Sequence, residues 1–220
     1  MSRTAVLFDL GGVVLGSPLQ AIRDYEAELG LERNAINRVA AMSAPTGAWS
    51  RLERGEIGLE IFYPAFEADC RAAGLKMDAR VMMNRIAGEA SARPAMLTAI
   101  ERLRAARFRV GALTNNWAHN EKEEADPIRS DGTRALKGFF DVFIESSVEG
   151  LRKPDPAIYR LACERLGSPP EEVVFLDDIG ANLKPARALG MATIKVEAPE
   201  IALSELAGMV GLDLLSDPDA

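Results

Sequence analysis

The sequence predicts an α/β protein in which a parallel β-sheet is covered by helices on both faces. Short apolar runs recur along the chain, and helical patterns separate the later ones. Runs that are apolar on both faces are typical of parallel strands buried between two layers of helices. One long segment near the N-terminus interrupts the alternation of strands and helices. Together these observations predict a parallel sheet with an inserted helical domain.

The strands and helices of the sheet region can be placed from apolar runs and capping residues. The predicted strands are residues 4–8, 108–113, 142–144, 173–176 and 192–196. The predicted helices between and after them are residues 95–106, 156–166, 182–189 and 201–210. Gly167 and Gly190 follow two helices, where a left-handed residue commonly ends a helix. Asp155 and Pro156 can begin another, as the N-cap and the first helical residue.

Residues 18–90 carry no convincing strand. Amphipathic helical patterns cover residues 20–29, 35–42 and 59–73, with glycines between them. We interpret residues 18–90 as a small helical domain, inserted into a core made of residues 1–17 and 91–220. A long helical crossover packed on the sheet is the alternative. A polar segment, residues 119–134, is predicted to be a surface loop.

Composition indicates an ordinary globular protein of 220 residues, long enough for one core with a smaller inserted domain. The net charge of −7 disfavours binding to nucleic acids or membrane surfaces, which usually requires a basic face. Cys70 and Cys163 are the only cysteines, which fits reduced thiols in a cytosol. No apolar run reaches membrane-spanning length, and no signal peptide is evident. We therefore expect a cytoplasmic protein with no nucleic-acid or membrane partner.

Carboxylates follow two of the predicted strands. Asp9 follows the first strand, and Asp177 and Asp178 follow the strand at residues 173–176. In parallel sheets, ligands bind at the carboxyl ends of the strands. Adjacent carboxylates repel one another, and Mg²⁺, which binds carboxylate and carbonyl oxygens, relieves this repulsion. The pattern predicts that the three carboxylates form a magnesium site at one edge of the sheet.

Two further polar segments could bind phosphate. Thr114 and Asn115 follow the second predicted strand, where hydroxyl and backbone N–H groups can bind phosphate oxygens. A polar turn that caps the next helix is the alternative. Lys153 precedes Pro154, which favours an extended backbone and lets the lysine be aimed at the crevice; a solvated surface lysine is the alternative. With the acidic cluster, these residues predict phosphoryl transfer to a carboxylate nucleophile.

With these segments in this order, the chain resembles the haloacid dehalogenase superfamily of aspartate-nucleophile hydrolases over essentially its whole length. The matching motifs are Phe8-Asp9-Leu10-Gly11-Gly12-Val13, Leu113-Thr114-Asn115, Lys153-Pro154 and Leu176-Asp177-Asp178. Residues 173–189 look like the N-terminal phosphatase domain of mammalian soluble epoxide hydrolase. The Leu10-Gly11-Gly12 sequence looks more like the phosphatase-like domain of acyl-CoA dehydrogenase family proteins. The resemblance implies a Rossmann-like, three-layer α/β/α fold, with residues 18–90 as a helical cap over the active site.

The resemblance also implies a Mg²⁺-dependent phosphatase that acts on a small phosphorylated metabolite. Asp9 would attack phosphorus, and water would then hydrolyse the aspartyl-phosphate, with Lys153 as the second catalytic residue. The implied metal ligands and their supporting residues are Asp9, the backbone carbonyl of Gly11, Asp178, Asp177 and Asn182. The phosphoryl oxygens would be bound by Thr114, the backbone of Asn115 and Lys153.

One position departs from the superfamily pattern. Its phosphatases usually carry a second Asp two residues after the nucleophile, as acid and base, and this chain has Gly11 there. General acid–base catalysis is worth roughly 10²–10⁴ in rate, so the phosphatase could be slow. His119, the single histidine, is a candidate substitute, with a surface histidine as the alternative.

Three other functions are weighed against a phosphatase. A catalytically weak or inactive member that binds a phosphate ligand or a protein partner would explain Gly11. A dehalogenase-like hydrolase also lacks the second Asp but needs no metal, so Asp177 and Asp178 argue against it. Epoxide hydrolysis is not expected. In the mammalian protein that the chain resembles, this reaction looks like the activity of a separate α/β-hydrolase domain, and we expect this chain to lack such a domain. A single histidine also leaves little scope for the catalytic triad of such a domain.

Substrate choice and assembly are less constrained by the sequence. Trp49 and Arg51 of the cap are candidate substrate contacts, with packing inside the cap as the alternative for Trp49. Caps of this superfamily sometimes mediate dimers, so a homodimer is one option for the assembly.

Overall fold

The computed structural model describes residues 3–117 and 135–215. Within these residues the strands form one sheet: β1 (Ala5–Phe8), β2 (Arg109–Thr114), β3 (Val142–Glu145), β4 (Val173–Asp177) and β5 (Ala192–Lys195). Their order is β3-β2-β1-β4-β5, and every neighbouring pair is parallel. The predicted fold class is therefore confirmed, and all the predicted strands agree with the observed ones to within one or two residues. His119 and the whole predicted polar loop, residues 119–134, lie outside the described residues.

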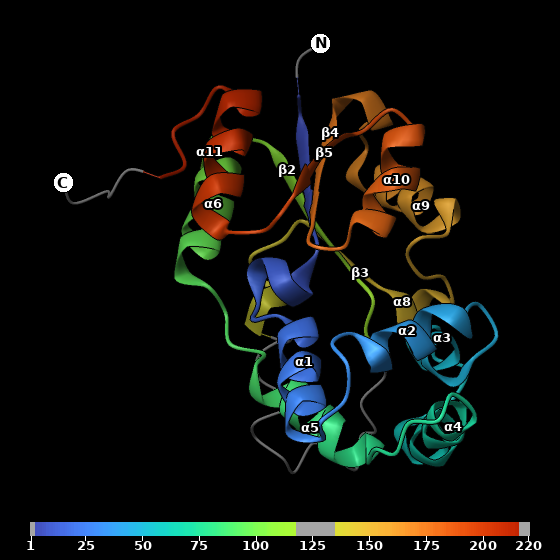
Figure 1. Ribbon diagram of the computed structural model, residues 1–220. Coiled ribbons are helices and arrows are strands. Elements are labelled where there is room, and N and C mark those ends of the chain that lie inside the picture. The colour runs from blue at the N-terminus through green and yellow to red at the C-terminus, as the bar shows by residue number, and fades with distance from the viewer. Residues whose placement is uncertain (1–2, 118–134, 216–220) are drawn as a thin grey trace.

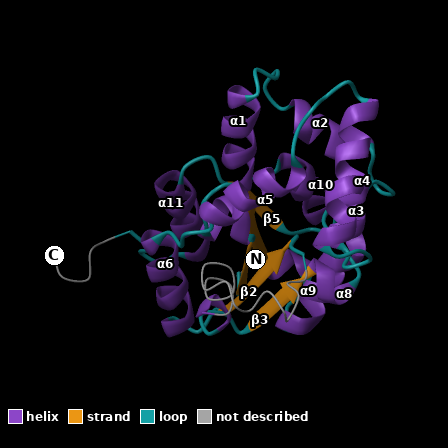
Figure 2. Ribbon diagram, turned by 90° about the horizontal axis from the view of Figure 1, so that it is seen from below, coloured by secondary structure: helices purple, strands orange, loops and turns teal. Residues whose placement is uncertain are grey.

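Helices cover both faces of the sheet (Figure 1). On one face lie α6 (Pro94–Ala105) and α11 (Pro199–Val210), and on the other lie α9 (Pro156–Leu166) and α10 (Gly180–Ala188). Figure 2, turned to look from below, shows the strands between helical layers. Alternate side chains of β1 enter the two hydrophobic clusters, Phe8 on the α6 side and Leu7 on the α9 side. This arrangement explains why the strands are apolar on both faces.

A group of helices lies beyond the carboxyl ends of the strands, at the bottom of Figure 1. These helices are α1 (Pro18–Glu28), α2 (Ala35–Met42), α3 (Ala48–Glu53), α4 (Leu59–Ala72) and α5 (Ala79–Gly88). They pack around a hydrophobic cluster of their own, in which the ring of Trp49 lies 5.7 Å from that of Phe62 and 5.4 Å from that of Phe66. Trp49 is thus a packing residue of the cap. The division at residues 17 and 91 stays a prediction.

Local signals in the sequence account for several boundaries. The Asp155 carboxylate accepts a hydrogen bond from the backbone N–H of Ala157 at 2.8 Å and caps α9, and Gly167 ends the same helix with φ +64°. The described residues also form shorter elements, among them the turn η1 (Leu10–Val14), α8 (Ser146–Glu149) and the 3₁₀ turn η3 (Pro170–Glu172). Both cysteines are free and buried. In residues 3–117 and 135–215, no helix is both long and apolar enough to span a membrane.

Candidate active site

Three of the predicted site segments meet at the carboxyl edge of the sheet. β1 lies between β2 and β4, and Phe8 pairs with Ala112 on one side and with Leu176 on the other. The backbone N–H of Asp9 donates to the carbonyl oxygen of Leu176 at 2.9 Å, which places Asp9 beside Asp177. The strand order reverses at β1, with β2 and β3 on one side and β4 and β5 on the other, and open α/β sheets bind ligands at such a switch point. The local fold therefore brings the predicted carboxylates together.

Lys153 lies between two of these carboxylates. Its Nζ is 2.8 Å from Asp9 Oδ1 and 2.8 Å from Asp177 Oδ2, and only 1% of its side chain is exposed. A solvated surface lysine is therefore excluded. Burial alone would lower the pKa of Lys153, but the charges of Asp177 and Asp9 outweigh it, so the pKa lies above its ordinary value. Lys153 is accordingly a buried cation.

The two adjacent carboxylates, Asp177 and Asp178, have different surroundings. Asp177 is fully buried, and both of its oxygens accept hydrogen bonds from Asn182 Nδ2 at 3.1 Å. Its Oδ1 also accepts the backbone N–H of Ile179 at 2.7 Å. Asp178 Oδ1 is buried and has no hydrogen-bond partner among the described residues. Burial, with the charge of Asp177, raises the pKa of Asp178 to about 6.

The donor set fits a magnesium ion. Asp9, Asp177 and Asp178 each offer an oxygen, and these oxygens lie within 4.8 Å of one another. Three carboxylates face one lysine, and burial, opposed by Lys153, raises the pKa of Asp9 well above its ordinary value. Asp178 Oδ1 has no hydrogen-bond partner among the described residues, so it can accept a bound cation. Because Asp177 is already hydrogen-bonded on both oxygens, it suits a supporting role better than Asp178 does.

Gly12 provides the space that Asp178 occupies. It has φ +80°, and a Cβ there would lie 2.2 Å from Asp178 Oδ2. We expect Gly12→Ala to displace the Asp178 carboxylate and to raise the Mg²⁺ concentration needed for half-saturation about tenfold or more, since a ligand misplaced by an ångström binds a metal poorly. The measurement is a Mg²⁺ titration followed by the thermal melting temperature. Gly180→Ala is the matched control, because a Cβ at Gly180 meets nothing within 4 Å; equal titrations of the two variants would contradict the assignment.

Gly11 stands where a second Asp was expected from the resemblance. Its backbone is ordinary, with φ −65° and ψ 122°, so any residue could adopt it. A Cβ at this position would lie 3.0 Å from Pro18 Cγ and 3.1 Å from Pro18 Cδ. Pro18 is the first residue of α1, so a longer side chain at position 11 would press against the start of the cap.

The predicted phosphate-binding residues lie next to this cluster. Thr114 ends β2 and is 5% exposed. The side chain of Asn115 brackets the backbone of Lys153: Asn115 Oδ1 accepts from Lys153 N at 2.9 Å, and Asn115 Nδ2 donates to Lys153 O at 3.0 Å. Sequence analysis assigned Asn115 only a backbone role. Its contact with Lys153 spans 38 residues and has no local signal in the sequence.

Sequence analysis also missed Glu53, the last residue of α3. Its Oε2 accepts a hydrogen bond from Arg152 Nε at 2.6 Å, and it lies 3.4 Å from Asn115 Nδ2. Glu53 belongs to a run of alternating charges that is typical of a solvated helix face. Arg51, the other candidate substrate contact, instead lies 3.5 Å from Glu56 in a partly exposed ion pair.

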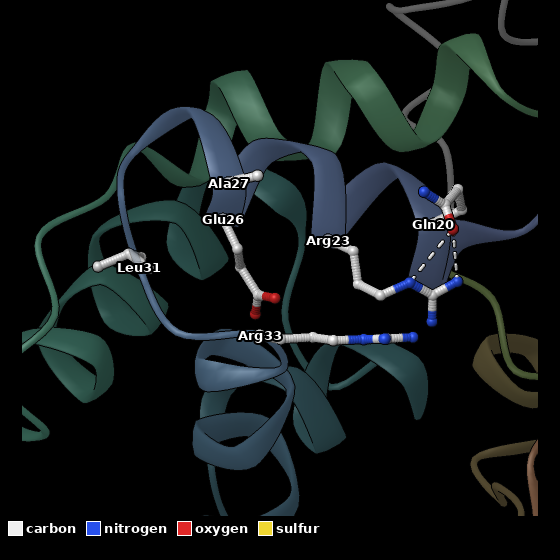
Figure 3. Close-up of a pocket in the computed structure, with 6 residues that line it drawn as sticks. All are labelled: Gln20, Arg23, Glu26, Ala27, Leu31 and Arg33. Carbon is white, nitrogen blue, oxygen red and sulfur yellow. Dashed lines mark hydrogen bonds between the residues drawn. The ribbon is translucent and has the colours of Figure 1, made fainter.

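A separate hollow of about 350 Å³ lies on the cap (Figure 3). It is lined by Gln20, Arg23, Glu26, Ala27, Leu31 and Arg33. The Glu26 carboxylate accepts the backbone N–H groups of Asn34 at 2.6 Å and Ile36 at 2.8 Å, so it stabilises the start of α2. None of the predicted site residues lines this hollow.

Comparisons with known proteins agree with this geometry. The chain is 36% identical to "Bifunctional epoxide hydrolase 2" of Sus scrofa over 99% of its length, and 35% identical to "Acyl-CoA dehydrogenase family member 10" of Mus musculus over 97%. It spans only 40% and 20% of those two proteins. Among solved structures, a predicted HAD-like family hydrolase from Porphyromonas gingivalis matches with a TM-score of 0.65 and 26% identity, over 94% of this chain and 98% of that one.

Shorter matches do not choose one reaction. A glyceraldehyde 3-phosphate phosphatase of Methanopyrus kandleri is 29% identical over 47% of this chain and 42% of its own length. An (S)-2-haloacid dehalogenase of Burkholderia cepacia is 32% identical over 49% of this chain and 44% of its own. The sequence model of the haloacid dehalogenase-like hydrolase family matches residues 4–190. The predicted resemblances to soluble epoxide hydrolase and to acyl-CoA dehydrogenase family proteins are confirmed. The chain belongs to the haloacid dehalogenase-like hydrolase family.

Proposed function

We propose that this chain is a Mg²⁺-dependent phosphatase that hydrolyses a small phosphorylated metabolite through an aspartyl-phosphate on Asp9. One observation carries the proposal: a buried lysine bridges Asp9 and Asp177 at 2.8 Å, beside an Asp178 oxygen that has no partner among the described residues. The site thus combines a held carboxylate, a fixed cation and an incomplete set of metal ligands.

The surroundings of Asp9 suit nucleophilic attack once Mg²⁺ is bound, because a cation beside Asp9 would favour its ionised form, which burial disfavours in the metal-free chain. Its Oδ1 accepts the backbone N–H of Leu10 at 2.7 Å and lies 2.8 Å from Lys153 Nζ. These donors fix the carboxylate and leave Oδ2, which has no hydrogen bond in the described part of the chain, to attack phosphorus. Thr114, the backbone of Asn115 and Lys153 would bind the phosphoryl oxygens, and Lys153 would offset the charge that develops on them.

Asp9, Asp178 and the backbone carbonyl of Gly11 would hold Mg²⁺, with Asp177 and Asn182 in support. When bound, the ion would neutralise part of the negative charge on the phosphoryl group and the carboxylates. Asn182 donates to both oxygens of Asp177, and Tyr159 Oη donates to the carbonyl oxygen of Asn182 at 2.7 Å. These bonds keep the supporting residues in place while substrate enters.

Gly11 shapes the expected kinetics. With no carboxylate at this position, neither departure of the leaving group nor attack by water receives a proton-transfer partner there. Substrates whose leaving groups depart without a proton should react faster, and hydrolysis of the aspartyl-phosphate should be slow. The same residue, with Pro18 against it, favours one alternative: a weak or inactive member that binds a phosphate ligand.

Phosphate release from a broad panel of phosphomonoesters, measured with Mg²⁺ and with EDTA, tests the proposal. We expect release that depends on Mg²⁺ and is fastest for good leaving groups. Halide release from 2-haloacids, measured in parallel, tests the dehalogenase alternative. Halide release that persists in EDTA, without phosphate release, would contradict the proposal. Phosphate binding without turnover would favour the inactive member.

Magnesium should stabilise the fold at neutral pH and lose this effect below about pH 6. The pKa of Asp178 rises from 3.8 to about 6 in the folded, metal-free chain. Between these values the folded chain holds a proton that the unfolded chain has lost, so metal-free stability falls as pH rises through this window. Mg²⁺ binds the ionised form, so its effect grows with pH. Melting temperatures with and without Mg²⁺, at about pH 7.5 and about pH 5, measure this.

The control for this experiment is Asp178→Asn, which should show no Mg²⁺ effect at either pH. An equal rise in melting temperature at both pH values in the unaltered protein would contradict the role of Asp178.

A further inference from the structure

A carboxylate from the cap is buried against the loop that carries Lys153. The side chain of Glu53 is 9% exposed. Its Oε1 accepts a hydrogen bond from Trp49 Nε1 at 2.9 Å, one turn earlier in α3. Its Oε2 accepts from Arg152 Nε at 2.6 Å and lies 2.5 Å from Arg152 Nη2. One oxygen therefore contacts the cap, and the other contacts the core.

The ion pair between Glu53 and Arg152 holds α3 against the core. Burial raises the pKa of Glu53, while Arg152 and the hydrogen bond from Trp49 oppose the rise. A buried charge that loses its partner is strongly unfavourable. Moving α3 away from the core would expose Glu53 and Arg152 to solvent or leave one of them buried and unpaired. In either case, both contacts between Glu53 and the Arg152 guanidinium are lost together.

The residues that Glu53 contacts are also the residues that position Lys153. Arg152 precedes Lys153 directly, and Asn115 hydrogen-bonds both the N–H and the carbonyl oxygen of Lys153. Asn115 Nδ2 is shared, because it also lies 3.4 Å from Glu53 Oε2. Lys153 Nζ in turn contacts Asp9. A short chain of contacts thus links the cap carboxylate to the nucleophile.

A second contact, with no charges involved, seats α3 on the core. Gly55 has φ +69°, and a Cβ there would lie 2.3 Å from the carbonyl oxygen of Ser147 in α8. The turn after α3 therefore lies directly on core backbone. Trp117, which follows β2, packs against the hydrophobic cluster of the cap. Glu53 thus lies in an interface where the backbone after α3 packs directly against the backbone of α8.

We propose that Glu53 is a positioning residue through which the seated cap orders the Lys153 loop, so that the active site is complete only when α3 is docked. When the contact breaks, Arg152 and Asn115 lose a common acceptor, and Lys153 is held less firmly beside Asp9. The catalytic consequence rests on the proposed phosphatase function, whereas the structural link between α3 and the loop does not.

The first test is backbone hydrogen exchange, followed by mass spectrometry, on Glu53→Gln in the full chain. We expect exchange to become at least about tenfold faster in α3 and in residues 150–155, and to stay unchanged in β1 and β4. Glu56→Gln is the matched control, since Glu56 lies three residues further on and pairs with Arg54 in an exposed position. Its exchange should match that of the unaltered protein.

The second test is steady-state phosphatase kinetics of Glu53→Gln, Arg152→Gln and the double variant. Each single change should lower kcat about tenfold or more, and the double variant should be no slower than the slower single one, because both remove the same contact. The shape of the pH profile should not change. Loss of one limb of that profile in Glu53→Gln would overturn the positioning role, since it would make Glu53 an acid or base.

These measurements separate the positioning role from the proposed function. Unchanged exchange at residues 150–155 in Glu53→Gln overturns the positioning role, whether or not the protein releases phosphate. Faster local exchange in a protein that releases no phosphate supports the link and contradicts the phosphatase. If exchange in Glu53→Gln is fast throughout the chain, Gly55→Ala is the deciding variant, because it keeps the Glu53 charge and disturbs the contact between the turn after α3 and Ser147. Faster exchange confined to α3 and residues 150–155 would then support the proposal. Unchanged exchange in those residues would overturn it.

Discussion

Replacing Asp9 with Asn is expected to abolish phosphate release, with a loss of roughly 10⁴-fold or more, as for other enzymes that lose their nucleophile. Asn has the same shape but cannot attack phosphorus. The fold should survive, because burial and the charges of Asp177 and Asp178 disfavour the ionised form of Asp9, and Lys153 keeps Asp177 as a partner. The measurements are phosphate release with Mg²⁺ and the thermal melting temperature.

The control for this variant is Asp24→Asn, which changes an exposed carboxylate of α1 that accepts a hydrogen bond from Gln20. It should keep full activity. Turnover of Asp9→Asn within tenfold of the unaltered protein, with phosphate as the product, would show that another residue is the nucleophile.

Replacing Lys153 with Met should have the largest effect on stability. The change leaves Asp9, Asp177 and Asp178 together with no cation, and breaking a buried ion pair typically costs about 3–5 kcal/mol in the free energy of unfolding. Urea unfolding at neutral pH measures this free energy. Mg²⁺ should restore part of the loss, because it supplies positive charge to the same carboxylates, but turnover should stay low without the lysine.

Lys195→Met is the matched control. Lys195 pairs with Glu197 at 2.6 Å, but both side chains are more than half exposed, and exposed pairs contribute about 1 kcal/mol or less. A loss in Lys153→Met no larger than in Lys195→Met would contradict the buried, bridging role of Lys153.

The sheet could be predicted because its physical cause is local. A strand buried on both faces is largely apolar, and this pattern marks β1, residues 110–113 of β2 and residues 173–176 of β4. The caps of α9 are equally local, since Asp155 and Gly167 act on backbone groups within a few residues. α3 has six residues and a charged surface, so no periodic pattern marked it. Its position depends on contacts with the core, which the sequence does not display.

The candidate site divides in the same way. Asp9, Asp177 and Asp178 could be predicted to meet because parallel strands end at a common edge. The different surroundings of the two adjacent aspartates could not, because they depend on Asn182 and on a buried oxygen that has no partner among the described residues. Glu53 and Arg152 are 99 residues apart, and only tertiary packing shows that they touch. Periodicity in the sequence predicts where helices and strands lie, whereas side-chain partners far apart in the sequence are determined by tertiary packing.

The most direct test of the central claim is to look for phosphate on Asp9. The protein would be mixed with a phosphomonoester that has a good leaving group, quenched in acid within the first turnovers and mapped by peptide mass spectrometry. Because Gly11 offers no acid or base, we expect the intermediate to hydrolyse slowly, and we predict a phosphoryl group on the peptide that contains Asp9, present with Mg²⁺ and absent with EDTA. Steady phosphate release with no covalent phosphate on that peptide, or with phosphate on another residue, would contradict the account.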